Sequence, residues 1–177
     1  MFKKLFLVLL LAAPLSVFAQ KFAHFDYTAI MQALPETKAA QTELEKLGKQ
    51  YQTELENMQK ELQTKAEKYQ NEDNDKTPAN IRERHQQELQ DMYQRLQQAQ
   101  QDNSQSFQEE QAKKMQPITQ KVMNTVNTVA TEGGYVYIFD KTSAQQGGIF
   151  INENISVDLT STIMKKLGVS AAPAAKK

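Results

Sequence analysis

The sequence contains no cysteine, and aromatic residues are sparse in its middle. Without cysteine there is no disulfide framework, no thiolate metal site, no catalytic cysteine and no lipidated N-terminal cysteine. The middle of the chain is instead rich in glutamine, lysine and glutamate. This composition is typical of a long exposed helix rather than of a compact globule. Because disulfides are excluded, packing alone must stabilise the fold.

The chain also has no surplus of either charge, since 21 basic residues face 21 acidic ones. The first 19 residues contain Lys3 and Lys4 but no acidic residue, so a chain without them carries 19 basic and 21 acidic residues. The resulting net charge of about −2 gives no general reason to bind nucleic acid, and we expect no nucleic-acid partner.

Long hydrophobic runs are absent except at the N-terminus. There Lys3 and Lys4 precede an apolar run of about a dozen residues, which is shorter than the roughly 20 that span a bilayer. The run ends in the residues VFA, which are suited to the positions before a cleavage site. We therefore expect residues 1–19 to be a secretory signal peptide and the remaining chain to be exported and soluble.

The segment after residue 34 predicts a helical rod. Pro35 is suited to a first helical turn, and the apolar residues after it recur at steps of three and four. Their spacing repeats every eleven residues rather than every seven, which favours a nearly straight pairing of helices. The rod should end near Asn71, where turn-forming residues begin. Its apolar positions are Leu44, Leu47, Tyr51, Leu55, Met58, Leu62, Ala66 and Tyr69.

A second rod with the same apolar spacing follows the first. Thr77 is placed to cap it, and Pro78 is suited to its first turn. Its seam would run antiparallel to the first seam, so the two rods predict a helical hairpin. Counting back from the tip pairs Tyr69 with Ile81, approximately. The seam positions of the second rod are Ile81, His85, Leu89, Met92, Leu96, Gln100, Asn103 and Phe107.

The second seam weakens between Leu96 and Phe107, where the sequence QQAQQDNSQS contributes only Ala99. This stretch either lies partly in water or forms a compliant region that lets the hairpin flex. Farther on, Pro117 should kink the helix. A denser stripe of β-branched residues follows, which is typical of a helix that enters a packed core.

Strand-like segments lie at both ends of the remaining chain. Residues 21–27, 135–139 and 149–151 predict three short strands, the last two as a hairpin around a polar loop. Asp158 should then cap a short helix over residues 159–167. Three short strands make a marginal sheet, and their apolar excess indicates that both faces need a cover. We expect oligomerisation to provide it.

These elements define an α+β protein, in which a long antiparallel helical hairpin, or coiled-coil arm, projects from a small β-rich oligomerisation body. The helices form an excursion between strands that meet again in the body. The predicted parts are a body at residues 20–34 and 118–168, an arm at 35–117 with its tip near 71–77, and a disordered tail at 169–177.

No set of residues predicts catalysis, a cofactor site or a metal site. His24 and His85 have no helix-spaced partner histidine, and His85 occupies a seam position. The acidic groups around Glu72 and Glu109 are expected to be solvated surface. The two glycine pairs are turns, because no lysine and serine follow them at the spacing of a phosphate loop. We therefore expect neither an enzyme nor a bound cofactor.

The order of these segments resembles the Skp/OmpH family of periplasmic chaperones, in its Bacteroidetes-like form with a proline before the body helix. The resemblance covers essentially the whole chain after the leader. It implies a homotrimer whose three arms enclose a cavity, and an ATP-independent holdase that keeps unfolded outer-membrane β-barrel proteins soluble in the periplasm. It rests on HFDYTAIMQALPETKAAQTELEKL, the long polar hairpin, the IxxxV stripe, EGGYVYIFD and DLTSTIMKKL.

The resemblance also implies, by region, where contacts lie. Strand residues would form the trimer interface, and unfolded clients would contact the seam of the arm together with its polar surface. Met58 and Met92 are either core filler or adaptable client contacts, because thioethers suit promiscuous surfaces. The interface candidates are Phe22, Phe25, Val136, Ile138, Ile149 and Ile151. The client-contact candidates are Leu55, Met58, Leu62, Met92 and Leu96.

The charge of the arm departs from the family pattern. The best-known members are strongly basic, whereas the tip here reads NEDNDK and the chain is nearly neutral. This removes the electrostatic basis for long-range capture of acidic clients and leaves contact with lipopolysaccharide or membrane open. The alternative function is a structural or adaptor coiled coil of the cell envelope that binds one folded partner.

Overall fold

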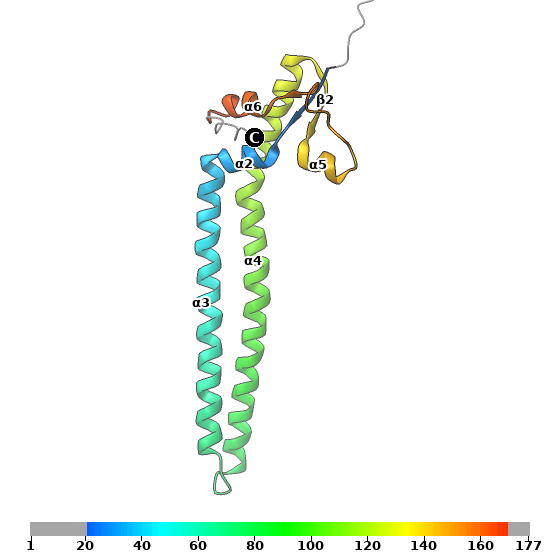
Figure 1. Cartoon of the computed structure of the whole chain (residues 1–177). Coiled ribbons are helices and arrows are strands. Elements are labelled where there is room, and N and C mark those ends of the chain that lie inside the picture. Colours follow the sequence, from blue (N-terminus) through cyan, green and yellow to red (C-terminus); the bar gives the residue numbers. More distant parts are fainter. Residues whose placement is uncertain (1–20, 170–177) are drawn as a thin grey trace, which may run out of the picture.

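A computed structural model describes residues 21–169. Figure 1 shows two long helices side by side, α3 (Pro35–Glu72) and α4 (Ala79–Gly133), with a short turn at one end and a small body at the other. The predicted α+β architecture of hairpin and body is confirmed. The predicted signal peptide at residues 1–19, and all of the predicted tail except Val169, lie outside the described residues.

The first helix of the arm begins where the proline predicts. Pro35 occupies its first turn, and Leu34 before it has extended backbone with φ −71° and ψ 126°, the conformation that a residue before proline prefers. α3 is 38 residues long, which corresponds to roughly 57 Å at about 1.5 Å per residue. It ends at Asp73, whose N–H donates to the Tyr69 carbonyl at 2.8 Å.

The second helix begins at Ala79, and its cap differs from the prediction. Pro78 is the N-cap, and its carbonyl accepts hydrogen bonds from the first turn of the helix. Thr77 does not cap α4. Its hydroxyl donates to the Glu72 carbonyl at 3.0 Å and accepts from the Asn74 N–H at 3.1 Å. The hydroxyl therefore ties the turn back to the end of α3.

α4 runs for 55 residues through Pro117. The proline does not interrupt the helix, although it removes one backbone donor. Its ring is exposed, so the carbonyl that loses this donor can bond to water. Beyond it, Ile118, Val122 and Val126 are buried at helical spacing. One continuous helix thus belongs to both the arm and the body.

The body contains a three-stranded parallel sheet in the order β2–β1–β3. The central strand is β1 (Lys21–Phe25), between β2 (Tyr135–Asp140) and β3 (Val157–Asp158). The predicted β-hairpin is wrong, because residues 149–151 form no strand and the predicted polar loop contains helix α5 (Lys141–Gln146). Parallel strands need a crossover connection, and α5 with the loop after it connects β2 to β3.

Asp140 at the end of β2 directs the chain into this helix. Its carboxylate accepts from the Ser143 N–H at 2.9 Å, as an N-cap does, and from the Tyr27 N–H at 3.0 Å. Burial raises the pKa of Asp140, but these hydrogen bonds outweigh burial and hold the pKa below its usual value. The carboxylate therefore joins the start of α5 to the start of helix α2 (Tyr27–Ala33).

The core lies between one face of the sheet and the helices α2, α4 and α6 (Thr160–Lys166). Side chains alternate along a strand, and Ala23 and Phe25 of β1 point into this core. Burial of each large aliphatic side chain contributes about 1.5–3 kcal/mol. The fully buried large aliphatic members of the core are Ile30, Leu34, Val122 and Ile163.

The last helix begins at Thr160 with Leu159 at its N-cap, so the predicted cap at Asp158 is wrong, although Asp158 assists this start from two residues before it. The Asp158 carboxylate accepts from the Thr160 N–H at 2.9 Å and from its hydroxyl at 2.6 Å. After α6, the Val169 N–H donates to the Met164 carbonyl at 3.0 Å, and Val169 packs against the core. The body therefore includes the first residue of the predicted disordered tail.

Candidate functional site

Within residues 21–169, the arm consists of α3 and α4, and no third layer covers its apolar seam (Figure 1). Of the five predicted client contacts, Leu96 is nearly covered, at 6% exposed. The other four are half-buried, so each keeps an apolar edge in water. Such a row of partly exposed apolar side chains is typical of an interaction surface. The half-buried residues are Leu55, Met58, Leu62 and Met92.

The pairing of the two helices differs from the predicted register by one turn. Tyr69 lies against His85 rather than Ile81, with ring centroids 3.8 Å apart and ring planes 1° from parallel. Asp73, just past the end of α3, also contacts His85, more than a turn into α4. The first turn of α4 therefore extends beyond the end of α3. A symmetric count from the tip misses this offset.

Ion pairs between the helices border the seam at three levels of the arm. In each pair the lysine holds the pKa of the carboxyl group below its usual value. The groups are largely exposed, so each pair contributes little to stability, although their spacing supports a single register. The pairs are Glu36–Lys121, Glu43–Lys114 and Glu88–Lys65.

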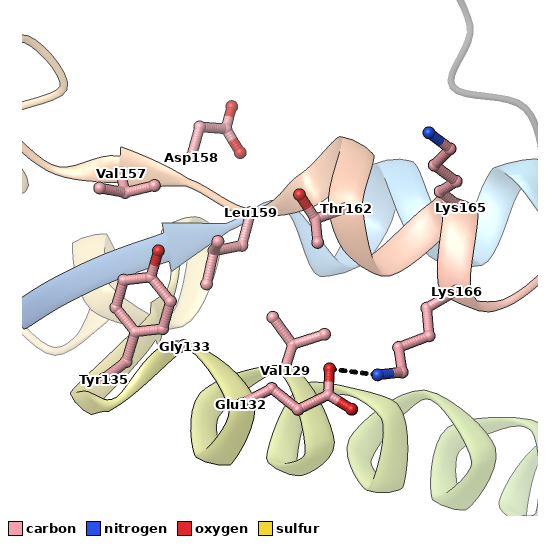
Figure 2. A pocket seen from close by; sticks show the side chains of 10 residues that line it. All are labelled: Val129, Glu132, Gly133, Tyr135, Val157, Asp158, Leu159, Thr162, Lys165 and Lys166. Carbon is pink, nitrogen blue, oxygen red and sulfur yellow. Dashed lines mark hydrogen bonds and ion pairs between the residues drawn. The ribbon is translucent and has the colours of Figure 1, made fainter.

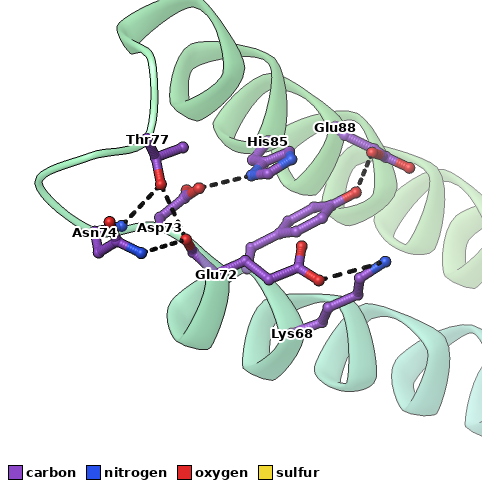
Figure 3. A network of polar contacts seen from close by, with 8 residues as sticks. Lys68, Glu72, Asp73, Asn74, Thr77, His85 and Glu88 are labelled. Atoms are coloured by element: carbon purple, nitrogen blue, oxygen red, sulfur yellow. Dashed lines mark hydrogen bonds and ion pairs between the residues drawn. The ribbon is translucent and has the colours of Figure 1, made fainter.

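A polar and aromatic network holds the tip of the arm, as Figure 3 shows. His85 is 9% exposed, its Nδ1 atom lies 2.9 Å from the Asp73 carboxylate, and its ring stacks on Tyr69. The Tyr69 hydroxyl donates to Glu88, which raises the pKa of Tyr69. Sequence reasoning placed His85 in the seam but gave it no partner. The sequence could have indicated these partners, because Tyr69 and Asp73 are four residues apart and share a helix face.

A hollow of about 580 Å³ opens between α3 and α4 at the middle of the arm. It lies where the sequence shows the weak apolar seam, and Tyr51, Leu55 and Phe107 supply its apolar lining. Gly48, the only glycine of the arm, borders it. A glycine inside a helix costs about 1 kcal/mol relative to alanine. The sequence analysis did not identify this glycine as an indication of a hollow.

The face of the sheet that points away from the core is apolar and exposed. Phe22 stacks on Tyr137 with centroids 5.8 Å apart, and Tyr137 on Phe139 with centroids 6.0 Å apart. The loop after α5 borders a hollow of about 430 Å³ beside these residues. This loop carries Phe150 and Ile155, which are 97% and 82% exposed. The body thus presents an apolar patch of the kind that marks an interaction surface.

The six predicted interface residues lie in different surroundings. Phe25 is 3% exposed inside the core, and Ile138 packs against the core, so neither offers much free surface to a partner. Sequence reasoning missed Tyr137, which is 55% exposed. Alternation along the strand would have separated Tyr137 from Ile138. The candidates that do not pack into or against the core are Phe22, Val136, Ile149 and Ile151.

A further hollow of the body, about 610 Å³ in volume, lies among the end of α4, the strands β2 and β3, and α6 (Figure 2). Three charged groups on its wall are engaged with neighbours, since Lys166 donates to Glu132 and Asp158 accepts from Thr160. Burial raises the pKa of Asp158, but the hydrogen bonds from Thr160 outweigh it and lower the pKa. These contacts stabilise the body and leave the hollow without a paired nucleophile and base among its lining residues.

His24 of the central strand is buried, and its Nδ1 atom lies 2.9 Å from the Ser156 hydroxyl. This contact ties β1 to the loop before β3. Within residues 21–169, no group of three or more metal-ligating side chains is placed to hold an ion. No helix in the same range has the length and apolar character needed to cross a membrane.

The fold and these surfaces define a protein with a long helical hairpin on a small parallel-sheet body. The sequence profile of the family "Outer membrane protein (OmpH-like)" matches residues 21–167, and the chain belongs to this family. The crystal structure of an OmpH-like protein from Caulobacter crescentus CB15, a candidate outer membrane chaperone, has the same fold. It aligns with a TM-score of 0.68 at 15% identity, over 84% of this chain and 83% of that one. No curated protein matches the chain.

Proposed function

We propose that the protein is an ATP-independent holdase chaperone of the periplasm. Three copies assemble through their bodies, and unfolded outer-membrane β-barrel proteins bind in the cavity between the arms, which keeps them soluble for delivery to the outer membrane. The observation that carries the proposal is the half-exposed apolar seam along a two-helix arm. Membership of the OmpH-like family, and the likeness to a candidate outer membrane chaperone, support it.

The seam suits a protein that binds many sequences weakly. Its half-buried leucine and methionine side chains each offer a small apolar contact, and methionine adapts its shape to different partners. An unfolded chain that touches several of them is retained by the combined contacts. Because no contact dominates, a single substitution such as Leu62→Ala should hardly change client binding.

Assembly through the body is supported by the exposed apolar face of the sheet. Phe22 and Tyr137 stack there with 47% and 55% of their surface exposed. Other copies of the chain would remove this surface from water, and the loop that carries Phe150 extends the same patch. The helices of the same subunit cannot cover this outer face, because they already pack on the opposite face of the sheet.

Charge has a minor part in the proposed binding. Residues 35–117 contain 16 acidic and 12 basic residues, so the arm has no excess positive charge with which to attract acidic clients or lipopolysaccharide. Apolar contacts must therefore supply most of the affinity. Added salt screens charge pairs but leaves apolar burial intact. We expect client binding to depend weakly on salt.

The holdase proposal is tested by diluting several urea-unfolded β-barrel proteins into buffer with the purified chain and no nucleotide. Light scattering should stay low at stoichiometric amounts of the chain. A variant with glutamine at all four half-buried client candidates should lose this effect, while a variant with four exposed glutamines of the arm changed to serine should keep it. Circular dichroism checks that both variants stay helical.

Failure to hold several unrelated clients would contradict the chaperone proposal. Tight binding of one folded envelope protein, without any effect on unfolded clients, would instead favour the adaptor coiled coil. Static light scattering on the isolated chain tests the assembly separately. A stable monomer at micromolar concentration would exclude the trimer.

A further inference from the structure

The hollow at mid-arm differs from the rest of the seam in being open rather than filled. Its apolar lining comes from Tyr51 and Leu55 on α3 and Phe107 on α4, and its volume is about 580 Å³. This volume lies within the range of small-molecule sites, roughly 300–1,000 Å³. The hollow is therefore large enough to accept an aromatic ring or a large aliphatic side chain.

Gly48 keeps the hollow open. A Cβ atom at this position would meet only the Phe107 ring, at 3.6 Å, which is ordinary van der Waals contact. Alanine would therefore fit, and it would favour the helix. The packing of the two helices does not require the glycine. A larger side chain at residue 48 would extend into the space between Tyr51 and Phe107.

The rim of the hollow carries mostly amides, with one carboxylate, that of Glu56, which accepts a hydrogen bond from Gln52. Gln59, Gln100 and Gln108 are exposed around it, and an amide can both donate to and accept from a peptide backbone. Between Arg95 and Glu109, the α4 wall contains a single charged residue, Asp102. An uncharged polypeptide loses little hydration energy at such a rim, whereas a charged one would lose hydration and meet only one charged lining residue, Glu56, which already accepts from Gln52.

Two other polar groups of the hollow are engaged within the arm. Gln52 donates to Glu56 at 2.8 Å, and Asn103 donates to Glu54 at 3.2 Å. These bonds orient both amides, and the one to Glu54 joins the two helices beside the hollow. The walls are thus held in place while the apolar lining stays uncovered.

We propose that the mid-arm hollow is a subsite for an aromatic or large aliphatic side chain on an extended, uncharged stretch of unfolded polypeptide. This subsite rests on the proposed holdase function, for which it supplies a defined contact within a diffuse seam. Its specificity is for side-chain size and lack of charge, because the amide rim binds backbone groups without reading sequence. The arm of a second copy is a poorer match, since its exposed faces carry charged residues.

The absence of tryptophan makes the test direct, because the fluorescence of a tryptophan probe has no background from the chain. The probe is a blocked nine-residue peptide of serine and threonine with one central tryptophan. A second peptide has lysine and glutamate beside the tryptophan. The first peptide should bind with a blue shift, and the charged peptide should bind about tenfold more weakly.

The variants for this test change only the space in the hollow. Gly48→Leu should weaken binding of the uncharged probe by about tenfold, because the leucine occupies the space that the ring needs. Gly48→Ala should have a smaller effect. Ala39→Leu adds the same side chain to an exposed position of α3 and should leave binding unchanged. Circular dichroism confirms the helical content of all three.

Equal binding of the probe by Gly48→Leu and the unmodified chain would overturn the subsite. A photocrosslinking form of the probe gives a second measurement on the unmodified chain, and its labels should fall on residues 48–59 and 100–108. Labels elsewhere would overturn the proposal, as would a change in mass of Gly48→Leu by light scattering, which would mean that a second copy fills the hollow.

The same preparations are used in the assay with unfolded β-barrel proteins, so that the two proposals fail in different ways. If the chain keeps these proteins soluble but does not bind the probe, the subsite is wrong and the holdase function stands. If it does neither, both are wrong. If Gly48→Leu loses the probe but still holds whole clients, the subsite is supported as one contact among many.

Discussion

The body and the arm of this protein bury apolar side chains to different extents, and α4 shows the difference within one helix. In the body, Val122 of α4 is fully buried under α2 and α6, whereas in the arm Leu89 and Met92 of the same helix are only half-buried. The cause is the number of layers, since in the described part of the chain the arm has a second helix but no third. The geometry that makes the arm a poor core leaves its apolar side chains available to other chains.

The two regions also use polar groups differently. In the body, carboxylates such as Asp140 cap helices and join elements far apart in the sequence. In the arm, ion pairs and the stack of His85 on Tyr69 determine how the two helices are aligned. The body should therefore unfold as one unit, while the arm should open locally.

The largest expected effect comes from a charge in the body core. Val122→Asp should lower the free energy of unfolding by about 4 kcal/mol or more, because it buries an unpaired carboxylate. Urea unfolding followed by circular dichroism measures the change. Met123→Asp, at the neighbouring position that is 44% exposed, is the matched control. Equal losses in the two variants would contradict the placement of the core.

A charge on the outer face of the sheet should separate assembly from folding. Tyr137→Asp should weaken subunit association by about 3 kcal/mol while leaving helical content unchanged, because the residue is exposed in the single chain but buried in the proposed trimer. Light scattering and circular dichroism measure both properties. Ile138→Asp is a poorer probe because Ile138 packs against the core of its own subunit.

The control for Tyr137→Asp is Gln145→Asp, which places the same charge on an exposed position of α5. It should leave the mass of the assembly unchanged. If Tyr137→Asp also keeps the full mass, the outer face of the sheet is not the interface.

Loss of the tip network should affect the arm and leave the body unchanged. His85→Ala removes the stack on Tyr69 and the contact with Asp73, which should destabilise the tip by about 1–2 kcal/mol. Hydrogen exchange should accelerate by about tenfold over residues 69–88 and stay constant in the body. The control is Arg84→Ala at an exposed neighbouring position. Equal acceleration in the body would show that the two regions are coupled.

Gly48→Ala should stabilise the arm by about 0.5–1 kcal/mol, because alanine loses less conformational entropy in a helix and fits beside Phe107. Hydrogen exchange of the amides around residue 48 should slow accordingly. Ala39→Gly on the same helix should produce the opposite change. Destabilisation by Gly48→Ala would mean that the helices need the glycine for close approach.

The smallest effect should come from the ion pairs of the arm. Lys114 holds the pKa of Glu43 below 4.5, its unperturbed value. A depressed carboxyl pKa contributes stability above the unfolded pKa of about 4.5, and this stability is lost as the pH falls through the folded pKa. Carboxyl NMR should therefore show Glu43 titrating at a lower pH than in Lys114→Gln. High salt should reduce the difference, and identical titration curves at low salt would contradict the pairing.

The arm was predictable because its signals are local. Apolar residues at steps of three and four determine which side chains share a helix face, and each such step spans one turn. The predicted seam residues of α3 are indeed buried or half-buried from Leu44 to Tyr69. Pro35 marks the start of α3 as expected, and Gly134, at the end of α4, has the positive φ, +64°, that favours glycine.

The sheet was predicted less well because strand propensity does not specify a partner. Residues 149–151 have the composition of a strand but lie beside a hollow, and the two-residue β3 pairs with β1 instead. The capping carboxylate of Asp140 turned the chain into α5 where a loop was expected. Among candidate site residues, Leu55 and Phe22 could be proposed from the sequence, whereas Tyr137 and Gly48 became candidates only through their neighbours in the fold.

The sequence by itself determined that two long helices form, where each begins and ends to within two residues, and which face of each is apolar. These properties depend on side chains within a turn or two of one another. Only the tertiary structure decided the helix register, the parallel order β2–β1–β3 and the three hollows. These depend on contacts such as Tyr69 with His85 and Ala23 with Ile138. Residues this far apart in the sequence come into contact only in the folded chain, where shape and charge determine which of them pair.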